Sequence, residues 1–385
     1  MPNPNAIVST TIHFEPPLDR APAEILRAEG GLSIELEGGR RVRLDPANER
    51  SAGFAQVLDG LSKQRLPVYL EIDPATDAIT RILIPHVARV IGVSPADQGR
   101  LDIELDASHA RHVLRLGDAD AADLERQLRD ALNSGSPVIL VEDDAHNIID
   151  VRAFTPAPDG PLPPFPPFPL PEPNLPPRYP WPLSWIWWLL HWLWWWIKWP
   201  WWWWFRCLSM TTAQQVFNEM AATSCNPLTV PAPCIPFLYP DDGCWARAHE
   251  MCRLMINRGL SPRKVWIDHS VGRWLHVDTK NNPQCYVEWG WHVAPTLCVR
   301  GPKWFHTQRM VIDPSLFTAP VSEATWKGVQ GDPGATLTHT DASVFWHGGG
   351  TDPTYSASNA ILAQYRLALQ TRSIQVGPPP YANCP

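Results

Sequence analysis

A central stretch of proline and tryptophan divides this 385-residue chain and limits what it can fold into. Residues 156–182 read PAPDGPLPPFPPFPLPEPNLPPRYPWP. Proline removes backbone donors and fixes φ, so this stretch cannot form a helix or a sheet. We therefore expect a semi-rigid, Pro-rich linker over residues 156–183, with a folded unit on either side of it.

The segment after the linker is almost entirely apolar. Residues 184–205 read SWIWWLLHWLWWWIKWPWWWWF and are interrupted only by His191, Lys198 and Pro200. As a helix this segment would just span a bilayer, but tryptophan prefers the membrane interface and Pro200 would disturb the last turn. An interfacial membrane anchor is favoured. A single span, or tryptophans packed on the protein's own domains, are the open alternatives.

Charge is distributed unevenly between the two flanking parts. Residues 1–155 hold 16 Lys and Arg against 25 Asp and Glu, whereas residues 206–385 hold 14 against 12. No basic block, RNP-like motif or zinc-finger spacing is present, so nucleic acid is not an expected partner. The opening MPNPNAIVSTTIHFEPPLDR has neither a basic n-region nor an apolar h-region, so no cleaved signal peptide is predicted. Secretion by another route and membrane association both stay open.

Two segments of the N-terminal region, residues 1–155, resemble each other. Leu32 to Ile84 and Leu101 to Phe154 form an internal repeat with a period of about seventy residues. In each copy the patterns predict strand, strand, helix, strand, strand, with LSIEL matching LDIEL at the start. We expect two small α+β modules (ββαββ) that bind a partner or inhibit the other half, since no nucleophile or ligand cluster stands out.

The most informative segment of residues 206–385 is YPDDGCWARAHEMCRLMINRG, from Tyr239 to Gly259. It predicts a helix with Asp241 or Asp242 as N-cap and Gly259 at the C-terminal end. Cys244 then lies in the first turn. The positive end of a helix dipole favours a thiolate, the species that attacks a carbonyl carbon, although a cysteine here is more often structural.

A thiolate nucleophile needs a base and a third group that orients the base. The stretch CYVEWGWHVAPTLCV, residues 285–299, predicts a strand centred on His292. The stretch RMVIDPSLF, residues 309–317, predicts a second strand that ends at Asp313. Antiparallel pairing of the two strands would set His292 beside Asp313.

Three motifs, PFLYPDDGCWARAH, WHVAP and VIDPSLF, occur in this order and resemble the secreted bacterial protein-glutaminases. The resemblance implies that Cys244, His292 and Asp313 form a catalytic triad. It also implies a papain- or transglutaminase-like domain, in which the nucleophile's helix packs on an antiparallel sheet. Precursors of the protein-glutaminase family carry an N-terminal segment that covers the active site. The front half of this chain shows no recognisable match to that segment.

The family resemblance further implies the reaction. Cys244 would attack the side-chain amide of a protein-bound glutamine, His292 would protonate the departing ammonia, and water would cleave the thioester to glutamate. The expected partners are therefore proteins with accessible glutamines, and no cofactor or metal is expected. A transglutaminase or a cysteine protease would use the same triad, and a membrane- or partner-binding protein with a secondary catalytic domain is the alternative of another class.

All eight cysteines follow the central stretch, and they differ in expected role. His249 and Cys252 lie at helical spacing, but no second pair complements them, so a zinc site is not expected there. Cys225 with Cys234, or other pairs among the non-catalytic cysteines, could form disulfides in an oxidising environment.

Overall fold

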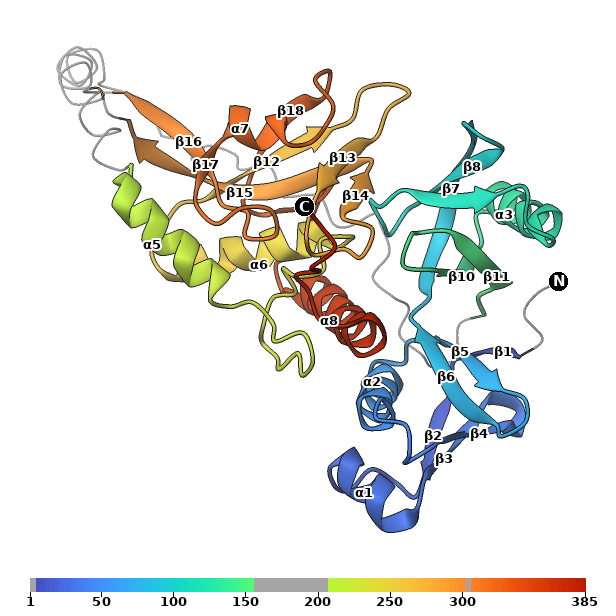
Figure 1. Cartoon of the computed structure of the whole chain (residues 1–385). Helices are drawn as coiled ribbons and strands as arrows, with labels where there is room; N and C mark the ends of the chain where they lie inside the picture. The colour runs from blue at the N-terminus through green and yellow to red at the C-terminus, as the bar shows by residue number, and fades with distance from the viewer. Residues whose placement is uncertain (1–4, 156–206, 302, 304–305) are drawn as a thin grey trace, which may run out of the picture.

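The computed structural model describes residues 5–155, 207–301, 303 and 306–385 (Figure 1). The expected Pro-rich linker at 156–183 and Trp-rich segment at 184–205 lie outside the described residues. Within the described ranges, no helix is both long and apolar enough to cross a membrane. The described chain has an α+β fold built on mostly antiparallel sheets.

The first module, residues 5–84, is one sheet with two helices. Its strands lie in the order β1-β5-β6-β4-β3-β2. Leu32, Ile34 and Leu36 alternate with half-buried residues along β3, as a strand with one buried face requires. The elements are β1 Ala6–Ser9, β2 Ile12–Glu15, α1 Pro22–Glu29, β3 Leu32–Leu36, η1 Glu37–Gly39, β4 Arg41–Leu44, α2 Ser51–Gln64, β5 Val68–Asp73 and β6 Ala78–Leu83.

The second module, residues 86–155, has a five-stranded sheet in the order β11-β10-β7-β8-β9. Helix α3 buries Leu124, Leu128 and Ala131, which recur at helical spacing and so lie on one face. The elements are β7 His86–Ala96, β8 Arg100–Leu105, β9 His112–Arg115, α3 Ala121–Ser134, β10 Pro137–Glu142 and β11 Ile148–Ala153. The order β8, β9, α3, β10, β11 is the same strand, strand, helix, strand, strand order as β3, β4, α2, β5, β6 in the first module.

The C-terminal domain, residues 207–385, packs helix α6 on an antiparallel sheet with the order β17-β16-β15-β12-β18. One core lies between α6 and the sheet, and a second lies on the other side of the sheet, around Trp289 and Trp326. The elements are α5 Met210–Ala221, α6 Cys244–Asn257, β12 Arg263–Asp268, β13 Leu275–Asp278, β14 Tyr286–Trp289, β15 Trp291–Arg300, β16 Thr307–Val311, β17 Val321–Ser322, α7 Glu323–Gly328, β18 Thr336–Asp341, β19 Val344–Trp346, β20 Gly349–Thr351 and α8 Ser356–Val376.

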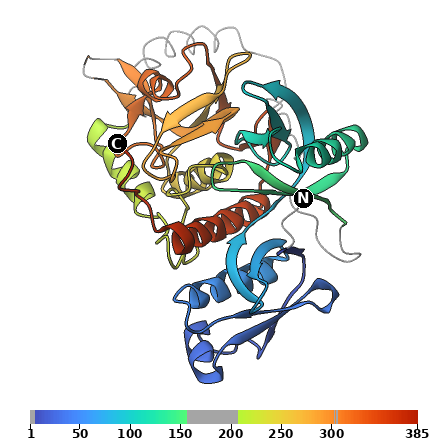
Figure 2. The ribbon, with the colours of Figure 1, turned by 45° about the vertical axis from the view of Figure 1, so that its right-hand side comes forward.

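Helix α8 joins the C-terminal domain to the first module. Figures 1 and 2 show it, in red, between α6 and the blue first module. Tyr365 packs in the core of the C-terminal domain, whereas Leu367 belongs to the core of the first module. Gly60 of α2 allows the close approach, since a Cβ at this position would lie 2.7 Å from Leu367. One helix is therefore shared by two cores.

Three disulfides crosslink the C-terminal domain: Cys207–Cys298, Cys225–Cys234 and Cys285–Cys384. The pairing of Cys225 with Cys234 is one that the sequence allowed. Crosslinks that close long loops stabilise a fold mainly by restricting the unfolded chain. Cys244 and Cys252 are the free cysteines among the described residues, and both are buried.

Candidate active site

Helix α6 presents Cys244 as its first residue. The expected N-cap at Asp241 or Asp242 is wrong: the N-cap is Gly243, with φ 78°. Gly243 is needed here for two reasons, because its φ is left-handed and because a Cβ would lie 2.5 Å from the ring of Tyr365. Near the other end of the helix, Ile256 is 48% exposed.

The two aspartates do not cap the helix because other partners hold their carboxylates. Asp242 accepts hydrogen bonds from the Tyr365 hydroxyl at 2.6 Å and from the backbone N–H of Gly243 at 2.8 Å. Asp241 receives both terminal nitrogens of Arg372, at 2.8 and 2.9 Å. Both side chains are fully buried, so these pairs fix the loop just before Cys244.

His292 and Asp313 lie together, on neighbouring strands of the sheet. His292 is on β15, and Asp313 follows β16 directly, where the backbone N–H of Ile312 still bonds to Pro295 at 2.9 Å. Nε2 of His292 lies 2.9 Å from Oδ2 of Asp313. The strand predicted over residues 285–299 is in fact two strands, because the chain bends at Gly290 and β14 pairs with β13 instead.

The surroundings of Asp313 keep its carboxylate charged. Burial alone would raise its pKa, but the adjacent His292 and hydrogen bonds from His292 and Trp326 outweigh burial, so the pKa is lowered. Trp326 Nε1 donates to Oδ2 at 2.9 Å. An ionised carboxylate that accepts a hydrogen bond from Nε2 selects the tautomer of His292 that has its lone pair on Nδ1. This Nδ1 is buried and has no hydrogen-bond partner among the described residues.

Cys244 lies against β15 at the residue after His292. The backbone N–H of Val293 donates to its sulfur, and Val293 and Cys244 share one core. Burial raises the pKa of the thiol, and this outweighs the opposing effects of Arg247 and the Val293 N–H. In this covered state the cysteine is therefore held as an unreactive thiol.

The cover comes from residues 106–111 of the second module, which we call the docking segment. Its backbone pairs with the end of β14 as an added antiparallel strand, with an isolated bridge between Ala110 and Trp289. The N–H of Gly290 bonds to the carbonyl of His109 at 2.8 Å, and the N–H of Arg111 bonds to the carbonyl of Glu288 at 3.0 Å. The docking segment thus binds the site through main-chain hydrogen bonds, as extended peptides commonly do.

The side chain of His109 fills the space between the tryptophans and the candidate base. Its ring centroid lies 4.9 Å from that of Trp291, 5.6 Å from that of Trp245 and 6.2 Å from that of His292. Nε2 of His109 is 3.3 Å from Oδ1 of Asp242, but neither ring nitrogen makes a hydrogen bond. Burial lowers the pKa of His109 to about 3, although Asp242 opposes the shift, so the ring is neutral near pH 7.

Sequence reasoning missed the docking segment because its fit to the site arises only in three dimensions. One signal was available: between its first two aligned strands, the first module has only the residues EGGR, 37–40, whereas the second module has the longer DASHAR, 106–111. His249, on the same helix as Cys244, is buried, and its Nδ1 lies 3.0 Å from Nζ of Lys264. Among the described residues, the group suited to holding a metal is His86, His112 and Glu142, outside this site.

With this geometry established, comparison with known proteins gives the family. A family model described as glutaminase matches residues 213–330, a range that contains Cys244, His292 and Asp313. Residues 213–330 belong to the glutaminase family. The glutaminase domain therefore includes α6 and the central strands, and the match ends before α8.

Solved structures similar to this chain carry related names. A crystal structure of a pro-protein-glutaminase is 20% identical over 74% of this chain and 93% of that chain, with a TM-score of 0.46. A crystal structure of a protein-glutaminase is 28% identical over 42% of this chain and 89% of that chain, with a TM-score of 0.36. An NMR structure of the protein-glutaminase from Chryseobacterium proteolyticum is also 28% identical, over 40% of this chain and 84% of that chain, with a TM-score of 0.35. No curated protein matches the chain.

Proposed function

We propose that the chain is a protein-glutamine deamidase that converts protein-bound glutamine to glutamate and ammonia. The observation that carries this proposal is the glutaminase-family match over residues 213–330, which contains the cysteine, histidine and aspartate that the motifs single out. The hydrogen bond between His292 and Asp313 supports the assignment of base and orienting group.

The proposed mechanism uses these three side chains in sequence. Nδ1 of His292 takes the thiol proton of Cys244, and the sulfur attacks the glutamine side-chain carbon. The tetrahedral intermediate collapses to a thioester as His292 gives the proton to the departing ammonia. His292 then activates a water that cleaves the thioester, releasing glutamate and restoring the thiol. Asp313 keeps the imidazole in the required tautomer throughout.

The docking segment indicates how a substrate would bind. A substrate backbone placed like residues 109–111 would pair with Glu288 and Gly290, and its glutamine side chain would enter the space that His109 fills. Main-chain pairing carries little sequence preference, so selection would depend on the pocket formed by Trp245, Trp291 and His292. The substrate class is then any protein with a glutamine in an accessible extended segment.

The second module would act as a built-in inhibitor. It occupies the strand-pairing edge and the side-chain pocket at the same time, and it keeps the Cys244 thiol buried.

We also propose that the catalytic domain has the papain- or transglutaminase-like arrangement, and that the two modules arose as an internal repeat. Three disulfides favour work in an oxidising compartment, where the Trp-rich segment at 184–205 would reach a membrane interface.

Ammonia release tests the proposed activity. The full chain, and the same chain after proteolysis of its N-terminal half, are incubated with a glutamine-rich protein such as casein. Ammonia should appear without cleavage of the casein, and more of it after proteolysis. Cys244→Ala, treated identically, is the matched control and should release none.

Two outcomes separate the alternatives that use the same triad. Casein fragments without ammonia would indicate a cysteine protease and contradict the proposal. Ammonia that appears only together with incorporation of an added primary amine would indicate a transglutaminase, in which an amine replaces water as the acceptor of the acyl group.

A further inference from the structure

Three metal-ligating side chains converge at one point of the second module. His86 is the first residue of β7, His112 is the first residue of β9, and Glu142 is the last residue of β10. One ligand atom from each lies within 4.8 Å of the others. β10 pairs with β7 through Leu140 and His86, so the sheet itself holds these positions. Rigid elements of this kind fix ligand positions better than loops do.

The distances among these atoms are close to those of a coordination sphere. Nε2 of His86 is 3.0 Å from Oε1 of Glu142, and Nδ1 of His112 is 2.6 Å from Oε2. Ligand atoms about 2.0 Å from a tetrahedral zinc ion lie roughly 3.3 Å apart. Around such an ion, His112 and Glu142 would separate by about 0.7 Å, and a pair of ligand atoms as far apart as 4.8 Å would close by about 1.5 Å.

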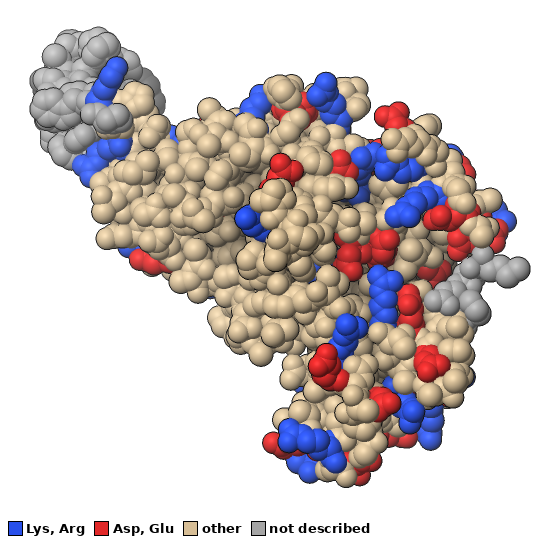
Figure 3. Space-filling view, in the orientation of Figure 1, with Lys and Arg blue, Asp and Glu red and all other residues tan. Residues whose placement is uncertain are grey.

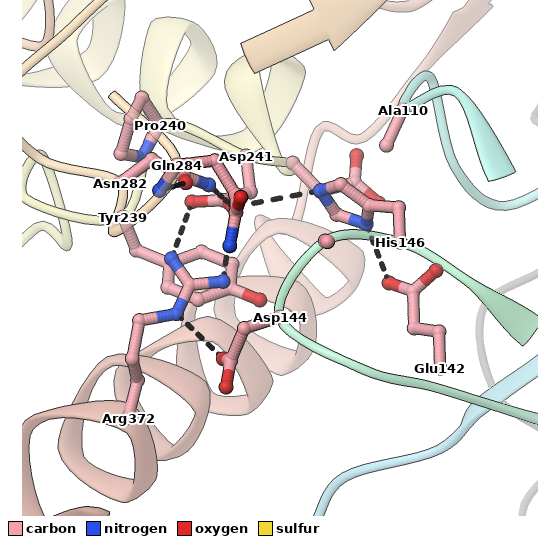
Figure 4. A network of polar contacts seen from close by, with 12 residues as sticks. Ala110, Glu142, Asp144, His146, Tyr239, Pro240, Asp241, Asn282, Gln284 and Arg372 are labelled. Atoms are coloured by element: carbon pink, nitrogen blue, oxygen red, sulfur yellow. Dashed lines mark hydrogen bonds and ion pairs between the residues drawn. The ribbon is translucent and has the colours of Figure 1, made fainter. Parts of the chain in front are cut away.

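The three candidate ligands also have the outer partners that metal sites use. The second nitrogen of His112, Nε2, lies 2.8 Å from the Ser108 hydroxyl. Glu142 accepts from Nδ1 of His146 at 2.8 Å, and Nε2 of His146 is 3.5 Å from Asp241 of the C-terminal domain (Figure 4). Such contacts orient a ligand and fix its tautomer.

A small space at the boundary with the C-terminal domain leads to the cluster. A cavity of about 50 Å³ is lined by His86 and Glu142 on one side, and by Tyr239 and Arg372 on the other. It gives an ion a polar route of entry and leaves room for a water as fourth ligand. The half-buried carboxylate of Asp144, which pairs with Arg372 at 3.0 Å, stands at the same boundary.

We propose that His86, His112 and Glu142 bind a divalent transition-metal ion of the zinc class. Two imidazoles and a carboxylate are a donor set that suits zinc, with an open fourth position. The competing interpretation is a cluster held by hydrogen bonds alone, in which Glu142 simply accepts from three histidines. The two interpretations differ in whether the folded chain binds one equivalent of metal.

The ion would also hold the docking segment in place. His112 directly follows that segment, and its other nitrogen contacts Ser108 within it. Metal binding would therefore favour the covered form of the active site. This second statement rests on the proposed inhibition, whereas the existence of the metal site does not.

Metal binding is measured on the full chain carrying Cys244→Ala, so that the active-site thiol cannot contribute. After treatment with EDTA and desalting, the protein is titrated with Zn²⁺ by calorimetry and with Co²⁺ by visible absorption. We expect about one equivalent per chain and a tetrahedral Co²⁺ spectrum without thiolate charge-transfer bands. His86→Ala and Glu142→Gln should each weaken binding at least about tenfold. His13→Ala, at an exposed histidine of the first module, should change nothing.

The titration of the chain with all three ligands intact decides the matter even if a ligand variant fails to fold. Less than about a tenth of an equivalent bound, or binding unchanged in a folded Glu142→Gln variant, would overturn the site in favour of the hydrogen-bonded cluster. If the ion holds the docking segment in place, Zn²⁺ should slow alkylation of Cys244 in the otherwise unmodified chain. Zn²⁺ binding without slower alkylation would contradict the effect of the ion on the docking segment, but it would not contradict the metal site itself.

Discussion

The two N-terminal modules share an order of elements but differ in one connection. Between β3 and β4 the first module turns through residues 37–40, where Gly38 and Gly39 have positive φ and nothing lies within 4 Å of their Cβ positions. Between β8 and β9 the second module has the docking segment, residues 106–111, which pairs with Glu288 and Gly290 beside the candidate active site. Two modules with the same order of elements thus differ in the loop that meets the C-terminal domain, and under the proposed inhibition this loop decides which module covers the site.

The modules also differ in where they touch the C-terminal domain. The first module packs α2 on α8, with Gln56 and Gln370 joined at 3.0 Å. The second module reaches the candidate base His292 through His109, and it reaches the loop before α6 through His146. The face shown in Figure 3 has its charged side chains gathered over the two modules, while the C-terminal domain is largely uncharged. Since both modules contact the C-terminal domain but only the second lies at the candidate site, we expect inhibition of the enzyme to depend on the second module. The stability of the folded chain should depend on both modules.

The most severe test of this contrast replaces residues 106–111 with the EGGR turn of residues 37–40. The replacement removes the main-chain pairing and the buried His109, together worth about 4 kcal/mol. Alkylation of Cys244 by iodoacetamide, followed by peptide mass spectrometry, should become about 1000-fold faster. An unchanged rate would show that other parts of the modules cover the site. Circular dichroism checks that the sheet survives.

Acid should weaken the docking of the second module but not that of the first. The pKa of His109 falls from 6.5 to about 3 when it docks, so docking favours the neutral ring. Docking is unaffected by this group above pH 6.5 and loses about 1.4 kcal/mol, or tenfold, for each pH unit below it. The charged and titratable groups that face the ring are Asp242, His292 and Arg247.

This pH dependence is measured as the alkylation rate of Cys244 in the full chain divided by the rate in His109→Ala. The ratio removes the change in thiolate fraction, which both chains share. From pH 6.5 to pH 5 it should rise about 15-fold, because half of the undocked rings are already protonated at pH 6.5. A flat ratio would mean that His109 does not titrate on leaving the site.

Arg111 ties the docking segment to both halves of the chain. Its guanidinium pairs with Asp102 at 2.9 Å and with Glu288 at 3.0 Å, and both pairs are partly shielded from solvent. Arg111→Ala should speed alkylation of Cys244 about tenfold, since a hydrogen-bonded charge pair contributes about 1.5 kcal/mol. Arg41→Ala, at an exposed arginine of the first module, is the matched control and should leave the rate unchanged.

The smallest effect on the active site is expected from the first module. Gly60→Leu would push α2 against Leu367, because even a Cβ would lie 2.7 Å from it. Overpacking should lower the free energy of unfolding by about 2 kcal/mol, as measured with urea. Alkylation of Cys244 should change less than about twofold. A rise in alkylation that matches the loss of stability would show that the two modules dock as one unit.

The sequence predicted the proximity of His292 and Asp313 better than it predicted the surroundings of Cys244. The motifs around Cys244, His292 and Asp313 are local, and the antiparallel pairing of the β15 and β16 strands follows from their apolar patterns. The N-cap was wrong because Asp242 bonds to Tyr365, which lies far along the chain. His109 and the cluster around Glu142 could not be found from local pattern, since their meaning depends on which strands become neighbours.

Helix α8 sets a condition on how the enzyme would be switched on. Leu367 and Ile374 are covered by α2 of the first module, so the loss of that module would leave a row of apolar side chains in water. Such a row favours renewed association, either with the released module or between enzyme molecules. Cutting the Pro-rich linker at residues 156–183 would then not be enough to activate the enzyme. The severed half would stay bound as a tight, reversible ligand until it is digested or displaced.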